Sequence, residues 1–174
     1  MKISVVIPHW DWNDKMGDYL DRCTRSLVAD EVIIVVNDGI GMGKAINIGL
    51  RASHGDYIVV SNNDLELVQG SLEDMCNPDG VTWANGAYKG SFYCMPRWVY
   101  EKCGGYDEQF EIGYFEDDDL IHRWELADIP MIKVERVVTK HEAGTTLDKQ
   151  PNRNEFFEAN RRRYMAKWGY SPQH

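Results

Sequence analysis

The sequence lacks the cysteine patterns of a zinc site or of a disulfide-stapled domain. Its four cysteines lie far apart and form no CxxC pair and no His/Cys cluster with the spacing of zinc ligands. We therefore expect free thiols at Cys23, Cys76, Cys94 and Cys103.

Long apolar runs are missing too. No stretch approaches the ~20 apolar residues that a membrane span needs. The apolar run that starts at Ile3 is too short for a signal peptide and has no cleavage-site pattern. Together with the expected free thiols, these absences predict a cytoplasmic protein.

Positive charge is scarce, because 19 Lys and Arg stand against 28 Asp and Glu, for a net charge of -9. Nucleic-acid backbones are held mainly by clustered Lys and Arg, so this balance argues against a general polyanion binder. The two glycine-rich phosphate-binding strings, GxxxxGK[ST] and GxGxxG, are also absent. Any nucleotide must therefore be bound by other means.

The composition is that of a folded domain. Hydrophobic residues make up 43% of the 174 residues and aromatic residues 11%, which is too apolar for disorder. No repeat, linker or low-complexity tract divides the chain. We expect residues 1–174 to form one domain.

The first third of the chain has a β-α-β-α-β pattern. Continuous β-branched runs predict strands buried on both faces, and apolar residues at spacings of three and four predict helices. The expected strands are Ile3–Ile7, Glu31–Val36 and Tyr57–Val60, and the expected helices are Asp14–Ala29 and Gly43–Ser53. Such units imply a parallel sheet with right-handed crossovers.

Polar residues follow each of these three strands. They are His9–Asp11, Asn37–Asp38 and Asn62–Asp64. Ligands of open α/β sheets bind beyond the carboxyl ends of the strands, so we expect all three sets to face one crevice.

The second part of the chain is less regular. Val81–Ala87 and Ser91–Met95 are expected strands, and Met131–Val138 is expected to form paired short strands. Helices are expected at Pro96–Lys102, Glu116–Ala127 and Asn154–Trp168.

The predicted C-terminal helix carries two distinctive sets of side chains. Its aromatic residues recur at near-helical spacing and should pack onto the domain. Its cations are interpreted as a solvated helix face, with nucleic-acid contact left open. The aromatic set is Phe156, Phe157, Tyr164 and Trp168, and the basic set is Arg153, Arg161, Arg162, Arg163 and Lys167.

Two features are candidates for a metal site. Asn62, Asn63 and Asp64 offer a carboxylate and two amides that suit a hard cation, although such clusters more often form turns. His141 follows a predicted strand and is either a packed side chain or a neutral imidazole ligand to the same cation.

Four consecutive acids, Glu116–Asp119, open a predicted helix. The helix dipole accounts for one or two acids there. An acid that points into the crevice is placed to take a proton from a hydroxyl as general base. Gly41 and Gly43 before another helix, with Lys44, either meet a phosphate or simply cap the helix.

The ordered set of motifs resembles the family 2 glycosyltransferases with a GT-A fold. The resemblance runs through nearly the whole chain, with Asn62–Asp64 in the place of the family's DxD metal motif. The other matching segments are Val5–Pro8, Val35–Gly39, Ala45–Gly49, Gly55–Ile58, Gly104–Glu108, Phe115–Leu120, Arg123 and His141. It implies a single α/β domain with a Rossmann-like, mostly parallel sheet flanked by helices, in which 1–64 binds the nucleotide and 65–174 forms the acceptor and catalytic half.

The resemblance also implies roles for single residues. Asp117 matches the catalytic base, and Asp64 matches the metal ligand, with help from Asn62 and His141. The nucleotide and donor sugar would be bordered by Pro8, His9, Trp10, Asn37, Asp38, Lys44, Asn47, Asn62 and Asn63. The donor and acceptor pocket would be shaped by Gly105, Tyr106, Asp107, Glu116, Asp118 and Arg123.

The sequence departs from the family pattern at two places. The DxD motif lacks its first acid, which leaves Asp64 as its only anionic ligand. Only five residues separate Gly39 from Ala45, where the family usually has a longer segment with another strand.

The function implied is metal-dependent, inverting transfer of a sugar from a nucleoside-diphosphate sugar to an acceptor hydroxyl, with Mn²⁺ or Mg²⁺. The acceptor is left open between a glycan, a lipid-linked sugar, a protein and a modified nucleic-acid base. The rival hypothesis is an inactive relative that binds a sugar or nucleotide. A nucleotidyltransferase ranks last, because His9–Trp12 replaces the expected basic, glycine-rich loop.

Overall fold

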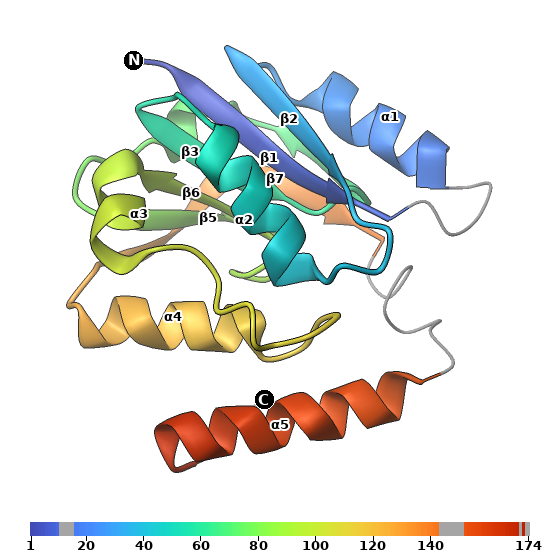
Figure 1. Cartoon of the computed structure of the whole chain (residues 1–174). Coiled ribbons are helices and arrows are strands. Elements are labelled where there is room, and N and C mark those ends of the chain that lie inside the picture. The colour runs from blue at the N-terminus through green and yellow to red at the C-terminus, as the bar shows by residue number, and fades with distance from the viewer. Residues whose placement is uncertain (11–15, 143–151, 171, 173–174) are drawn as a thin grey trace.

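The centre of the computed structural model is a seven-stranded sheet with helices on both faces (Figure 1). Residues 1–10, 16–142, 152–170 and 172 are described. The strands are β1 (Ile3–His9), β2 (Glu31–Val36), β3 (Tyr57–Ser61), β4 (Leu65–Gln69), β5 (Val81–Asn85), β6 (Phe92–Pro96) and β7 (Met131–His141). The helices are α1 (Met16–Ser26), α2 (Met42–Ala52), α3 (Arg97–Cys103), α4 (Glu116–Leu126) and α5 (Arg153–Trp168), with a short 3₁₀ turn, η1, at Glu73–Met75.

The sheet order is β2-β1-β3-β6-β5-β7-β4. The pairs β1 with β2 and β1 with β3 are parallel, which confirms the predicted βαβ units. The pairs of β6 with β3 and β5, and of β4 with β7, are antiparallel, whereas β5 and β7 are parallel. The sheet is therefore mixed rather than mostly parallel, because the short connection 86–91 can only join β5 and β6 as antiparallel neighbours.

The predicted burial of β1 on both faces is confirmed, since all seven of its residues are buried. Successive strand side chains point to opposite faces. Val5 accordingly packs in one core layer with Cys23 of α1, and Val6 packs in the other with Ile46 of α2.

The prediction that Glu31–Val36 is a buried strand is wrong. β2 forms an edge of the sheet, and Val32, Ile34 and Val36 are 40%, 45% and 58% exposed. An apolar run predicts a strand but does not say where the strand lies in the sheet. The helix that follows Asp14 is described from Met16 and ends at Ser26, while Asp14 itself lies outside the described residues.

Met131–Val138 is not a pair of short strands but part of the single strand β7. The register against β5 shifts between Ala84 and Asn85, so the alternation of buried residues along β7 is interrupted. This irregularity looks like a strand break in the sequence. The partner strand β4 was not predicted.

The aromatic residues of α5 pack onto the domain as predicted, except that Phe156 lies outside the cluster. Phe157, Tyr164 and Trp168 join Phe110 and Phe115 in a separate small core. In Figure 1, α5 lies beneath the sheet beside α4. Across the described ranges, no helix combines the length and apolar character that crossing a membrane requires.

Candidate active site

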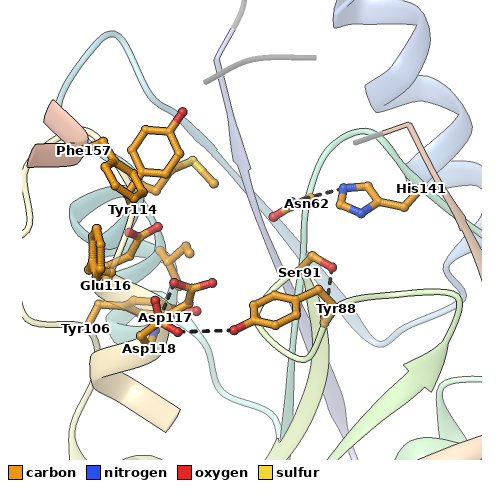
Figure 2. Close-up of a pocket in the computed structure, with 14 residues that line it drawn as sticks. Asn62, Tyr88, Ser91, Tyr106, Tyr114, Glu116, Asp117, Asp118, His141 and Phe157 are labelled. Carbon is orange, nitrogen blue, oxygen red and sulfur yellow. Dashed lines mark hydrogen bonds between the residues drawn. The ribbon is translucent and has the colours of Figure 1, made fainter. Parts of the chain in front are cut away.

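A cavity of about 510 Å³ lies between the ends of β3 and β7 and the start of α4 (Figure 2). Asn62 and His141 form one wall, and the acids of α4 form the wall across from them. Six of the predicted site residues line it: Asn62, Tyr106, Glu116, Asp117, Asp118 and His141. The fold therefore brings together side chains that are up to 79 positions apart in the chain.

The first wall joins the end of β3 to the end of β7. His141 Nε2 lies 3.1 Å from Asp64 Oδ1 and 3.3 Å from Asn62 Nδ2. A protonated Nε2 donates to the carboxylate, whereas an unprotonated Nε2 accepts from the amide. Strand pairing places His141 opposite Leu65, the residue after Asp64, so the sheet register fixes this contact.

These residues form an incomplete ligand set for a divalent cation. Within the described ranges, no group of three or more His, Cys, Asp or Glu is arranged to hold a metal. Asp64 and His141 supply one carboxylate and one imidazole, and the Asn62 side chain adds an amide oxygen. Mg²⁺ is commonly bound by one or two carboxylates together with substrate phosphates, so this set fits a cation that arrives with a diphosphate.

The second wall is the first turn of α4. Asp117 and Asp118 both line the cavity. Asp117 Oδ1 accepts a hydrogen bond from the Asp118 amide at 2.9 Å. Asp119 is completely buried and turned away, where it pairs with Arg123 at 2.9 Å and Lys167 at 2.7 Å. Asp119 is therefore not a candidate for the general base, and Asp117 and Asp118 remain as candidates.

Glu116 is buried at the edge of the cavity, and among the residues that the structure describes no hydrogen-bond partner reaches its Oε2. Burial, and then the neighbouring charge of Asp117, raise the pKa of Glu116 well above its ordinary value. The protonated carboxyl is favoured, so this side chain can donate a hydrogen bond where an ionised carboxylate could only accept.

Replacing Glu116 with Gln should stabilise the protein increasingly as the pH rises. The folded chain binds the carboxyl proton of Glu116 more tightly than the unfolded chain does. The stability that this proton contributes is therefore fully present below the ordinary pKa of Glu and is lost as the pH rises through the raised pKa. Gln does not titrate. We expect the melting temperature of Glu116→Gln, relative to wild type, to be higher at about pH 8 than at about pH 5.

The control for this experiment is Glu101→Gln, at an exposed position of α3. It should show no such trend between the two pH values. A melting-temperature difference for Glu116→Gln that stays constant with pH would show that Glu116 is ionised in the folded protein.

The sequence did not point to Tyr88, Gly90 and Tyr114, which also line the cavity. Tyr88 donates its hydroxyl hydrogen to Asp118 Oδ1 at 3.4 Å. A Cβ on Gly90 would lie 2.6 Å from Asp117 Oδ2, so only glycine lets this loop approach the acid. Tyr114 lies beside Phe157 of α5, with ring centroids 5.5 Å apart, and only Phe157 was among the aromatic residues predicted to pack onto the domain. Isolated Tyr and Gly residues in a loop carry no periodic signal, so nothing in the sequence marked them.

The predicted nucleotide side is organised around two buried Asn side chains. Asn63 Nδ2 lies 2.9 Å from His9 Nδ1, and Asn37 Oδ1 accepts from the Gly41 amide at 3.0 Å. Gly41 has φ +98° and would meet the backbone of Ile112 if it carried a Cβ, so it is required where it stands. None of Pro8, His9, Trp10, Asn37, Asp38, Lys44, Asn63 and Asp64 is among the described residues that line the cavity.

Other predicted pocket residues build the supporting frame. Asn47 donates to the Tyr106 carbonyl at 2.9 Å and accepts from its amide at 2.8 Å. Arg123 donates to the carbonyls of Cys103 at 2.7 Å and Gly105 at 2.6 Å. Asp107 pairs with Lys167 at 2.6 Å. Burial acts to raise the pKa of this carboxyl, but the contacts with Lys167 and the Gln109 amide outweigh it and lower the pKa. These residues hold the segment that carries Tyr106.

The cations of α5 are largely engaged with acids. Arg161 pairs with Glu158, and Arg163 pairs with Glu111. Lys167 contacts both Asp107 and Asp119. This pairing favours the interpretation of the basic set as a structural helix face.

Comparison with known proteins relates the chain to solved structures only. No protein-family model and no curated protein sequence matches it. The catalytic domain of Drosophila β1,4-galactosyltransferase 7, in complex with xylobiose, is 15% identical with a TM-score of 0.61, over 81% of this chain and 70% of that one. The mannosyltransferase PcManGT from Pyrobaculum calidifontis, in complex with GDP-Man and Mn²⁺, is 14% identical with a TM-score of 0.64, over 98% and 66%.

S. aureus TarS is 10% identical with a TM-score of 0.63, over 98% of this chain and 44% of TarS. The chain thus spans less than half of TarS and about two thirds of the mannosyltransferase. All three are GT-A glycosyltransferases, so the likeness confirms the predicted α/β GT-A fold.

Proposed function

We propose that this GT-A chain is an inverting glycosyltransferase that moves a sugar from a nucleoside-diphosphate sugar to an acceptor hydroxyl, with a divalent cation. One observation carries the proposal: Asn62 and His141, the latter 3.1 Å from Asp64, face a carboxylate suited to act as base across one cavity (Figure 2). The mannosyltransferase with the same fold was solved with GDP-Man and Mn²⁺, and the galactosyltransferase with xylobiose, which supports this substrate class.

The reaction divides its work between the two walls. The bond from the anomeric carbon to the diphosphate oxygen breaks while a bond to the acceptor oxygen forms. Asp64, His141 and Asn62 would hold the Mn²⁺ or Mg²⁺ that neutralises the departing diphosphate. Asp117 takes the proton of the acceptor hydroxyl as the hydroxyl attacks. Attack from the wall opposite the leaving group inverts the anomeric centre.

The aromatic rings beside Asp117 favour a sugar as the acceptor. Tyr88, Tyr114 and Phe157 line the cavity, and aromatic rings suit the apolar face of a pyranose. A nucleic-acid acceptor is less favoured, because the basic set of α5 is largely paired with acids. A relative that only binds sugar would have no use for a carboxylate in the position of Asp117.

Thermal stabilisation by a nucleoside diphosphate tests the proposal. Because the ligand set is incomplete, UDP or GDP should raise the melting temperature more with Mn²⁺ than without it. At ~100 times the dissociation constant, binding contributes roughly 2.7 kcal/mol, which raises the melting temperature by several degrees. Equal shifts with and without the metal would contradict the proposal.

Asp64→Ala should abolish the metal-dependent increment without changing the melting temperature of the unliganded protein by more than a few degrees. The matched control is Asp79→Ala, since Asp79 is an exposed acid that is not among the residues lining the cavity. It should keep the full increment. The same nucleotide sugars, screened for metal-dependent turnover, identify the donor.

A further inference from the structure

The segment that leads into α4 has an unusual backbone. Ile112, Tyr114 and Phe115 have φ values of +65°, +72° and +71°, a region that residues with side chains seldom occupy. Phe115 is immediately followed by Glu116 and Asp117, so these angles set the direction in which the acidic turn enters the cavity. Such a backbone persists only where the surroundings over-determine it.

One side chain of α5 supplies much of that constraint. Asn160 is completely buried, and its Nδ2 lies 2.9 Å from the Glu111 carbonyl, 2.7 Å from that of Gly113 and 3.2 Å from that of Tyr114. Its Oδ1 accepts from Arg163 Nη1 at 2.7 Å. A single NH2 group, with two hydrogens to donate, therefore lies within hydrogen-bond distance of three carbonyls of segment 111–115, none of whose residues belongs to a strand.

We propose that Asn160 is a positioning residue, whose amide holds segment 111–115 in the conformation that aims Asp117 at the acceptor hydroxyl. The effect of Asn160 on sugar transfer rests on the proposed function. Its contacts with segment 111–115 do not depend on that function. It assigns a role in the reaction to a helix that contributes only Phe157 to the lining of the cavity.

The chemistry of the contact requires Asn at this place. Leu would fill a similar volume but leave buried carbonyls without a donor, and Asp would replace the donor with an acceptor. The far end of α5 is anchored independently, because Trp168 Nε1 donates to Asp119 Oδ1 at 2.9 Å and Lys167 pairs with the same carboxylate. Loss of the Asn160 amide should therefore loosen the segment locally without releasing the helix.

The test compares Asn160→Leu and Asn160→Asp with Leu72→Ala, which destabilises the opposite core layer and does not touch the segment. Amide hydrogen exchange should speed up in residues 111–118 in both Asn160 variants and stay unchanged there in the control. The rate of transfer at saturating donor should fall roughly 10- to 100-fold, because misplacing a reacting group by about 1 Å costs that much. The metal-dependent rise in melting temperature with UDP or GDP should stay at the wild-type value, since the proposed metal ligands lie on the wall across from α4.

Wild-type exchange in 111–118, or an unchanged transfer rate in a folded Asn160 variant, would overturn the inference. If Leu prevents folding, Asp at the same position is the variant that decides. A wild-type chain that turns over no nucleotide sugar and shows no metal-dependent shift would overturn the proposed function instead. The exchange measurement would then still decide whether Asn160 holds the segment.

Discussion

Asp117→Asn is expected to lower sugar transfer by roughly 10²-fold or more while leaving donor affinity nearly unchanged. The substitution keeps the size and hydrogen-bonding shape of the side chain but removes the basic oxygen. A loss of 10²-fold corresponds to about 2.7 kcal/mol of transition-state stabilisation. Initial rates at saturating donor and acceptor, with the metal-dependent melting shift as the measure of donor binding, check the prediction.

Asp118→Asn is the matched comparison, because Asp118 also lines the cavity but is contacted by the Tyr88 hydroxyl. Its effect on the rate should be clearly smaller than that of Asp117→Asn. The reverse order would make Asp118 the base. If neither substitution matters, the chain is not an inverting transferase that uses this helix.

Deleting α5 from Asn154 onward should abolish the folded state. Loss of Phe157, Tyr164 and Trp168 would expose Phe110 and Phe115 to solvent. Burial of each large apolar side chain contributes about 1.5–3 kcal/mol to the free energy of unfolding. Several such losses are comparable with the ~5–15 kcal/mol that stabilises a whole domain. Circular dichroism and size-exclusion chromatography of the truncated chain should show unfolding or aggregation.

The control is Arg162→Ala, on the exposed side of the same helix. It should melt within a few degrees of wild type. A truncated chain that stays soluble and melts at the wild-type temperature would mean that the small core around Phe115 is dispensable, contrary to the packing seen in the structure.

Motifs that lie within one segment were predictable. The β-branched run of β1 indicated a strand buried on both faces, and the apolar spacing in α1 indicated a helix, because each pattern is contained in its own segment. Strands β2 and β7 show what a local sequence pattern cannot predict. Position at a sheet edge and a shifted register depend on neighbouring strands, which the local pattern does not contain.

The candidate site divides in the same way. The sequence by itself determined that Asp64, Asp117 and His141 are candidates for metal binding and proton transfer. Their residue types and their positions, after a strand or at the start of a helix, can be read directly from the sequence. Only the tertiary structure decided that His141 contacts Asp64 and that Asp119 points away from the cavity and pairs with Lys167. It also decided that Asn160 contacts the segment before α4. These outcomes depend on strand register, on the direction in which each helical residue points and on three backbone angles at positive φ, which arise only when distant segments pack against one another.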